Sequence, residues 1–129
     1  MAKQSIKSEA KKFAIETARI AEDSHCEEIL VLDLGGISPV TEYFVIATGT
    51  SDRQMRSIAD EMAQKGKKTG HKVWHVAGRD GGDWIVLDFV DVVVHLFNEE
   101  LRRYYDLELI WGEAPRVEWR RPTPAKPGS

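Results

Sequence analysis

The sequence predicts an α/β domain with a mixed sheet of about five strands and helices packed on it. Stretches with apolar residues at steps of three and four are interleaved with short runs rich in Val, Ile and Phe, which is the pattern of helices among strands. Only two residues separate the last two of these runs, so they are antiparallel neighbours. The 129 residues are enough for one such domain.

Two long helices are predicted from an apolar stripe along one side of each. Residues 5–22 have Ala, Ile and Phe at helical spacing, with Lys and Glu on the other side. Residues 50–70 repeat this pattern, and Ser51 and Gln54 have the spacing of a capping box at the helix start. The stripe of the second helix is Met55, Ile58, Ala59 and Met62.

The remaining elements are five strands and a last helix. The connection from Tyr43 to Val76 is predicted to be a right-handed parallel crossover. Asn98 should cap the last helix, in which Glu99 can pair with Arg102 or Arg103. The strands are expected at 27–34, 41–49, 71–78, 84–89 and 92–97, and the helix at 98–111.

Residues 113–129 are rich in Pro and polar residues, and their apolar residues show neither helical nor strand spacing. Such a composition cannot bury enough apolar surface to offset the entropy of ordering. We therefore expect a domain at 1–112 and a Pro-rich, disordered tail at 113–129.

The overall charge and the single cysteine limit the functional class. The net charge of −3 argues against nucleic-acid binding by phosphate neutralisation and is compatible with a basic protein partner. Cys26 is the only cysteine, which excludes an internal disulfide and suits a reducing compartment. There is no apolar stretch of about 20 residues and no apolar signal region, so we expect a cytoplasmic protein without a membrane contact.

Histidine and cysteine do not form a convincing metal site. His71 and His75 are four residues apart, but they lie in a predicted strand and not on a helix. Cys26 beside His25 is an isolated pair at a turn. A catalytic zinc needs three protein ligands with recognisable spacing, so we expect no metal and no cofactor.

Two other stretches could hold an anion. Residues 48–51 lie between a strand and a helix, and residues 65–70 are rich in Lys. Capping explains Ser51, and a solvated helix end explains the lysines, so neither stretch requires a ligand.

Nucleotidyl transfer is the enzymatic alternative. The expected topology resembles that of a nucleotidyltransferase, in which two carboxylates one residue apart on a strand hold the metal that bridges the triphosphate. The acidic residues on or beside strands form no Asp-x-Asp pair; they are Asp33, Asp83, Asp88 and Asp91. We therefore expect this topology without the active site and no enzymatic activity.

A protein-binding surface is the third possibility. Asp83, Trp84, Asp88 and Asp91 flank a hairpin, and an edge strand with acidic and aromatic side chains can dock a basic partner. Equally, Trp84 can belong to the core while the acids protect an edge from aggregation. Spacing alone leaves both interpretations open.

At this point the sequence resembles the ribosomal silencing factor family, also called Iojap-like. The resemblance covers about residues 5–112 and rests on three motifs in the order and spacing of the family: TGTSDRQ, DWIVLDFVDVVVHLF and RRYYDLELIW. It implies a small α/β protein that forms a homodimer and has no established catalytic activity. Members bind the large ribosomal subunit through the ribosomal protein numbered fourteen, block its joining to the small subunit, and repress translation, notably under nutrient limitation.

The resemblance also guides the choice of site residues. We expect the partner to be bound by Trp84 as an apolar anchor, by Asp83, Asp88 and Asp91 as charge partners, and by Arg102 and Tyr105 on the following helix. His95 is expected to face inward or toward a dimer partner.

Overall fold

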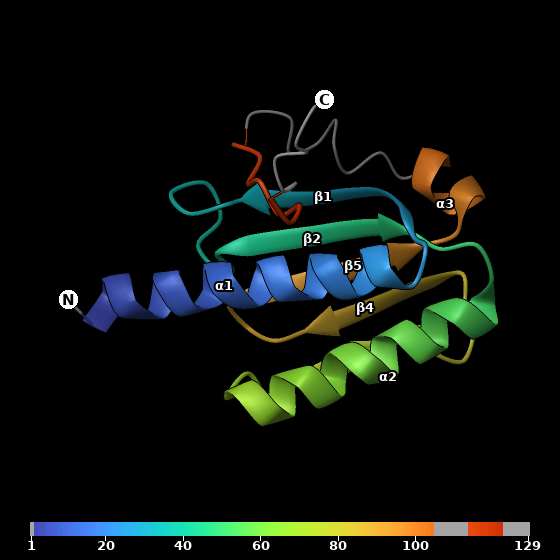
Figure 1. Ribbon diagram of the computed structural model, residues 1–129, viewed down its shortest axis with the longest axis horizontal. Coiled ribbons are helices and arrows are strands. Elements are labelled where there is room, and N and C mark those ends of the chain that lie inside the picture. The colour runs from blue at the N-terminus through green and yellow to red at the C-terminus, as the bar shows by residue number, and fades with distance from the viewer. Residues whose placement is uncertain (1, 105–113, 123–129) are drawn as a thin grey trace, which may run out of the picture.

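In a computed structural model, which describes residues 2–104 and 114–122, the chain forms one five-stranded sheet with helices on it (Figure 1). The strand order is β1-β2-β5-β4-β3, and only β2 and β5 are parallel neighbours. This confirms the predicted mixed α/β sheet. The strands are β1 (Glu27–Asp33), β2 (Tyr43–Thr48), β3 (His75–Ala77), β4 (Trp84–Asp88) and β5 (Val92–Phe97), and the helices are α1 (Ala2–Asp23), α2 (Asp52–Thr69) and α3 (Glu99–Tyr104).

Helices α1 and α2 lie side by side on the same face of the sheet (Figure 1). Alternate strand residues such as Val45, Leu87 and Val94 point to this face and are fully buried. Phe13 from α1 and Met62 from α2 pack onto them, each at most 1% exposed. The main core is therefore the layer between the two helices and the sheet.

The start and stop of α2 follow the predicted local signals. Ser51 Oγ accepts a hydrogen bond from the Gln54 N–H at 3.0 Å, and Gln54 Oε1 accepts one from the Thr50 N–H at 2.6 Å. At the other end Gly70 has a φ of 84°, a left-handed value that costs glycine little, and its N–H reaches the Gly66 carbonyl. Local chemistry thus sets both ends of this helix.

Replacing the cap tests this account. The substitution Ser51→Ala should lower the free energy of unfolding by about 1 kcal/mol, because the Gln54 N–H loses its acceptor. Ser57 is exposed within the same helix, so Ser57→Ala is the matched control and should leave stability unchanged or slightly raised. Urea denaturation of both variants measures the difference; equal midpoints would contradict the capping role.

The order of the strands in the sheet differs from their order in the sequence. Strands β2 and β3 are parallel, as predicted for the crossover, but β5 and β4 lie between them. The hairpin of β4 and β5 is therefore central and does not form an edge. The third strand is also shorter than the predicted 71–78, since only His75–Ala77 pair with β4.

The second face of the sheet has a smaller core of its own. Leu34, Ile46 and Phe97 are fully buried there, and Leu101 of α3 packs against them. Asn98 caps α3 as predicted, with its Oδ1 accepting from the Leu101 N–H at 2.8 Å. Glu99 pairs with Arg103 at 2.6 Å. The rest of the predicted helix 98–111 falls within residues 105–113, outside the described part of the chain.

Residues 114–122 belong to the part of the chain expected to be a disordered tail, but the structure places them against the sheet. These residues run along β1, with an antiparallel bridge between Leu32 and Arg116, and Trp119 is only 5% exposed. The polar composition of this segment predicted disorder, but its one large aromatic side chain, Trp119, packs into the main core. Residues 114–122 therefore pack against the predicted domain, and residues 123–129 lie outside the described part.

Candidate functional site

The sheet face opposite α1 and α2 carries an apolar groove of about 650 Å³. Three parts of the chain form it: the loop that precedes β2, side chains of β2 and β5 that point away from the long helices, and the β4–β5 turn together with Trp74. The lining residues are Ser38, Pro39, Val40, Thr41, Phe44, Trp74, Asp88, Val90, Val93 and His95.

Exposed apolar side chains gather at this groove. Four large hydrophobic residues among the described ones are exposed, and three of them line it: Val40 at 79%, Trp74 at 74% and Val90 at 53%. The fourth, Ile37, is 45% exposed and lies outside the lining. Contiguous exposed apolar surface marks an interaction site more often than single exposed residues do.

The β4–β5 turn holds Val90 at the groove in an unfavourable conformation. Val90 has a φ of 76°, which is rare for a β-branched residue. The Asp91 N–H donates to the Phe89 carbonyl at 3.0 Å, and the Asp88 carboxylate accepts from the Val90 N–H at 2.7 Å. Strain of this kind persists where the surroundings impose it, and it is frequent at functional sites.

His95 forms the floor of the groove and contacts Trp84, which lies outside the lining. The Trp84 Nε1–H donates to His95 Nδ1 at 3.2 Å, so the neutral imidazole carries its proton on Nε2. His95 is 8% exposed, and no hydrogen-bond partner of its Nε2 is found among the described residues. Burial lowers the pKa of His95 to about 4, so it is uncharged at neutral pH.

The four hairpin residues selected from the sequence do not form one cluster. Asp88 lines the groove, whereas Asp91 is not among the lining residues and follows Val90 in the β4–β5 turn. Asp83 precedes β4 and lies about 16 Å from Asp88, at 3.3 Å per residue along the strand. Trp84 shares the groove's face of the sheet but contacts Phe97 at a ring distance of 4.8 Å and supports the floor through His95.

The other two selected residues do not add to the groove. Arg102, predicted to contact a partner, is 5% exposed and donates from Nη1 to Thr48 Oγ1 at 3.0 Å. It ties α3 to the end of β2. Tyr105 lies outside the described residues.

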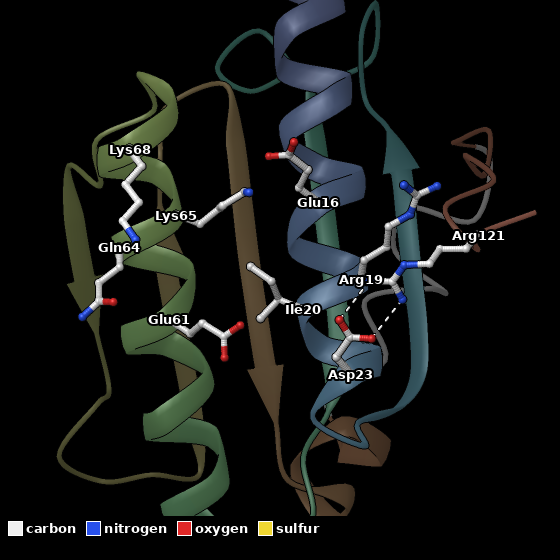
Figure 2. Close-up of a pocket in the computed structure, with 9 residues that line it drawn as sticks. All are labelled: Glu16, Arg19, Ile20, Asp23, Glu61, Gln64, Lys65, Lys68 and Arg121. Atoms are coloured by element: carbon white, nitrogen blue, oxygen red, sulfur yellow. Dashed lines mark hydrogen bonds and ion pairs between the residues drawn. The ribbon is translucent and has the colours of Figure 1, made fainter.

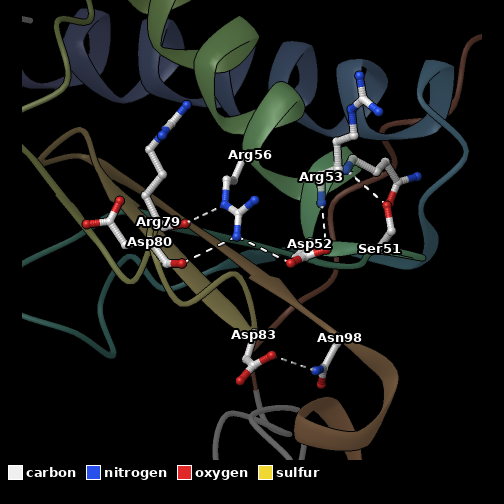
Figure 3. Close-up of polar contacts among 9 residues, drawn as sticks. Ser51, Asp52, Arg53, Arg56, Arg79, Asp80, Asp83 and Asn98 are labelled. Atoms are coloured by element: carbon white, nitrogen blue, oxygen red, sulfur yellow. Dashed lines mark hydrogen bonds and ion pairs between the residues drawn. The ribbon is translucent and has the colours of Figure 1, made fainter.

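A polar clamp positions the beginning of β4 (Figure 3). Arg56 of α2 donates from Nε to the Arg79 carbonyl at 3.0 Å and from Nη2 to the Asp80 carbonyl at 3.3 Å. Arg79 itself pairs with Asp60 at 2.7 Å, and this guanidinium lowers the pKa of that carboxyl. The loop before Asp83 is thereby held against α2.

The residues considered for metal chemistry do not converge. His71 stacks on Phe13 at a ring distance of 4.5 Å, and His75 lies on β3. Asp33 pairs with Lys7 at 3.2 Å at the far edge of the sheet from β4. Within the described residues there is no group of three or more His, Cys, Asp or Glu side chains that could hold a metal ion.

Sequence reasoning missed the groove because its exposed residues lie in loops and at a turn. Val40 and Trp74 precede their strands, and Val90 is in a turn, so no periodic pattern indicates their direction. The local signals for an exposed apolar surface were Val40, which follows Pro39 in a loop, and Trp74, which follows Val73. No described helix combines the length and apolar character needed to span a bilayer.

A family model and two relatives of known name that match this sequence all refer to the ribosome. The family described as "Ribosomal silencing factor during starvation" matches residues 7–128. The ribosomal silencing factor RsfS of Bacillus subtilis is 43% identical over 101 residues, which is 78% of this chain and 86% of that protein. A mouse protein named "Mitochondrial assembly of ribosomal large subunit protein 1" is 30% identical over 104 residues, covering 78% of this chain and 46% of its own length.

A solved structure agrees in fold. The crystal structure of a protein from Chromobacterium violaceum superimposes with a TM-score of 0.73 at 32% sequence identity, covering 90% of this chain and 89% of the other. The match over residues 7–128 also includes the segment along β1, which the sequence motifs had left outside the family region. This chain belongs to the ribosomal silencing factor family, whose members are named for a regulatory role at the ribosome.

Proposed function

We propose that this protein represses translation by binding the large ribosomal subunit and blocking its joining to the small subunit, notably under nutrient limitation. The partner is the ribosomal protein numbered fourteen. Membership of the ribosomal silencing factor family supports this proposal, and the name of the mouse relative refers to the large subunit. The protein acts in the cytoplasm as a homodimer.

The apolar groove is the docking surface in this proposal. Val40, Trp74 and Val90 offer exposed apolar side chains, Asp88 adds a carboxylate to the lining, and Asp91 follows Val90 in the chain. Apolar anchors surrounded by charge suit a partner that inserts an apolar side chain and carries Lys or Arg beside it. Ribosomal proteins are typically basic, so the acidic rim also speeds encounter.

Two of the residues selected from the sequence have indirect roles in this proposal. Trp84 holds His95, and through it the groove floor, in place. Asp83 accepts from Asn98 Nδ2 at 3.3 Å at the other end of β4, where it serves as a peripheral charge.

The mechanism requires occupancy of a surface and no chemical step. A subunit-joining face extends well beyond one small ligand, so a bound domain that covers part of it prevents contact by sterics. An interface of about 1,200–2,000 Å² is of normal size for such a complex. We therefore propose that the protein is not an enzyme.

Sedimentation of separated ribosomal subunits tests the proposal. Subunits mixed under joining conditions with a saturating excess of the protein should lose the joined peak, and the protein should migrate with the large subunit. A joined peak of normal size in the presence of bound protein would exclude the blocking mechanism. Migration with the small subunit would exclude the partner.

A further inference from the structure

Residues 114–122, which we call the strap, cover the outer edge of β1 (Figure 1). The Val117 N–H donates to the Val31 carbonyl at 2.8 Å, and the Asp33 N–H donates to the Pro115 carbonyl at 2.8 Å. The sheet order places β1 at one end, so this edge lies opposite β2. The strap occupies the position of a sixth strand over a few residues only.

The strap forms hydrogen bonds with backbone groups of β1 that point away from β2. In an antiparallel pair, residues alternate between those bonded to the neighbouring strand and those facing outward. The Leu34 N–H bonds to the Glu42 carbonyl beside β2, whereas Ile29, Val31 and Asp33 face the strap. An edge with such outward groups is a template for pairing with another extended segment.

One aromatic side chain anchors the strap. Trp119 is 5% exposed in the main core, and its Nε1–H donates to the Ile29 carbonyl at 3.2 Å. Arg19 of α1 donates from Nε to the Trp119 carbonyl at 2.8 Å. Apolar contacts therefore hold Trp119, together with one hydrogen bond that its indole donates and one that its carbonyl accepts.

Charge holds the end of the strap. Arg121 makes two hydrogen bonds to the Asp23 carboxylate at 2.9 Å (Figure 2). It makes a third to Glu22 at 3.3 Å. Arg121 also lowers the pKa of Asp23. The strap carries three arginines against one glutamate, while β1 begins with the exposed pair Glu27 and Glu28. The basic strap thus lies against an acidic surface, which we call the seat and which consists of Glu22, Asp23, Glu27 and Glu28.

Apart from Trp119, the attachment of the strap is weaker than that of a sheet strand. Its ion pairs are solvent-exposed, and such pairs contribute little each. Pro115 and Pro122 have no N–H to donate, which limits further pairing with β1. Segments with few backbone hydrogen bonds and exposed charges open at lower free energy than the sheet beneath them.

We infer that the edge of β1, together with Glu22 and Asp23, is a second docking site, whose ligand is an extended basic segment of a partner protein with an aromatic residue followed two positions later by arginine. In the free protein the strap occupies this site from the same chain. The strap is thereby an internal competitor, which a partner segment must displace by supplying the same aromatic and basic groups.

A synthetic peptide with the strap sequence APRVEWRRP serves as the probe. In a full-length chain carrying Trp119→Ala and Arg121→Glu, the strap loses its anchors and the seat becomes available. The peptide should bind this variant at least tenfold more tightly than the unaltered chain, because an attached competitor acts at a high effective concentration. A peptide with alanine at the tryptophan should bind at least tenfold more weakly, and added salt should weaken binding.

A single substitution provides a readout in case the double variant does not fold. Arg121→Glu alone keeps Trp119 in place and should speed hydrogen exchange at the Asp33 amide, whereas Lys67→Glu on α2 makes the same charge change and should not. The inference is overturned if the folded double variant does not bind the peptide, or if the unaltered chain binds it equally well. Self-association of the variant without peptide binding would also overturn it, since the ligand would then be a second copy.

Discussion

The substitution Trp74→Ala should weaken binding to the large ribosomal subunit at least 30-fold. Trp74 is 74% exposed and is the largest exposed side chain at the groove, where it stands beside Val40 and Val90. A tryptophan that becomes buried in an interface typically contributes 2 kcal/mol or more, and about 1.4 kcal/mol corresponds to tenfold in affinity. Binding can be measured by titrating labelled protein with purified subunits.

The matched control is another exposed hydrophobic residue outside the groove. Ile37 is 45% exposed and does not line it, so Ile37→Ala should bind within about twofold of the unaltered protein. Both variants should unfold at nearly the same temperature, because neither side chain belongs to the core. Full binding by Trp74→Ala would remove the groove from the docking surface and would leave the family assignment intact.

Acid should destabilise the fold through His95. Its pKa is about 4 in the folded chain against an ordinary value of 6.5, because burial disfavours the imidazolium. Between these two pH values the unfolded chain binds a proton that the folded chain does not, so stability falls as the pH falls. The loss is about 1.4 kcal/mol per pH unit and reaches about 3 kcal/mol near pH 4. Below that pH both states are protonated and the loss from this residue stops.

A variant without a titrating group isolates this effect. Glutamine at position 95 can still accept from the Trp84 indole and keeps a donor, so His95→Gln should be less dependent on pH between about 6.5 and 4.5. Urea denaturation at several pH values gives the difference between the two proteins. Parallel pH profiles would show that His95 is solvated and that the low pKa is wrong. The carboxyls with lowered pKa values, Asp23 and Asp60, lose their contribution only at lower pH.

The groove and the strap lie at different places on the same small sheet. The groove is on the face away from α1 and α2, while the strap closes the free edge of β1 and sends Trp119 into the core on the helix side. Binding at one position leaves the other accessible. Variants at Trp74 and at Trp119 should therefore report on separate interactions.

The outcome for individual site residues shows how far sequence reasoning reached. Asp88 and Asp91 were selected from their position in an apolar run; Asp88 lines the groove and Asp91 follows the lining residue Val90, because the turn between β4 and β5 is local. Arg102 resembled an exposed helix arginine by spacing alone. Its burial depends on Thr48, which is 54 residues earlier in the chain, and no local pattern contains that contact.

Local chemistry by itself determined the elements of this protein: the apolar stripes of α1 and α2, the Ser51 and Asn98 caps and the antiparallel β4–β5 hairpin follow from residues a few positions apart. Recognition of the family motifs likewise needed the sequence only. Tertiary structure alone decided that the hairpin is central, that Val40, Trp74 and Val90 meet at one groove, and that Trp119 returns to β1. The physical reason is that these contacts join segments distant in sequence, and their free energy depends on the complementarity of surfaces that exist only after the sheet has formed.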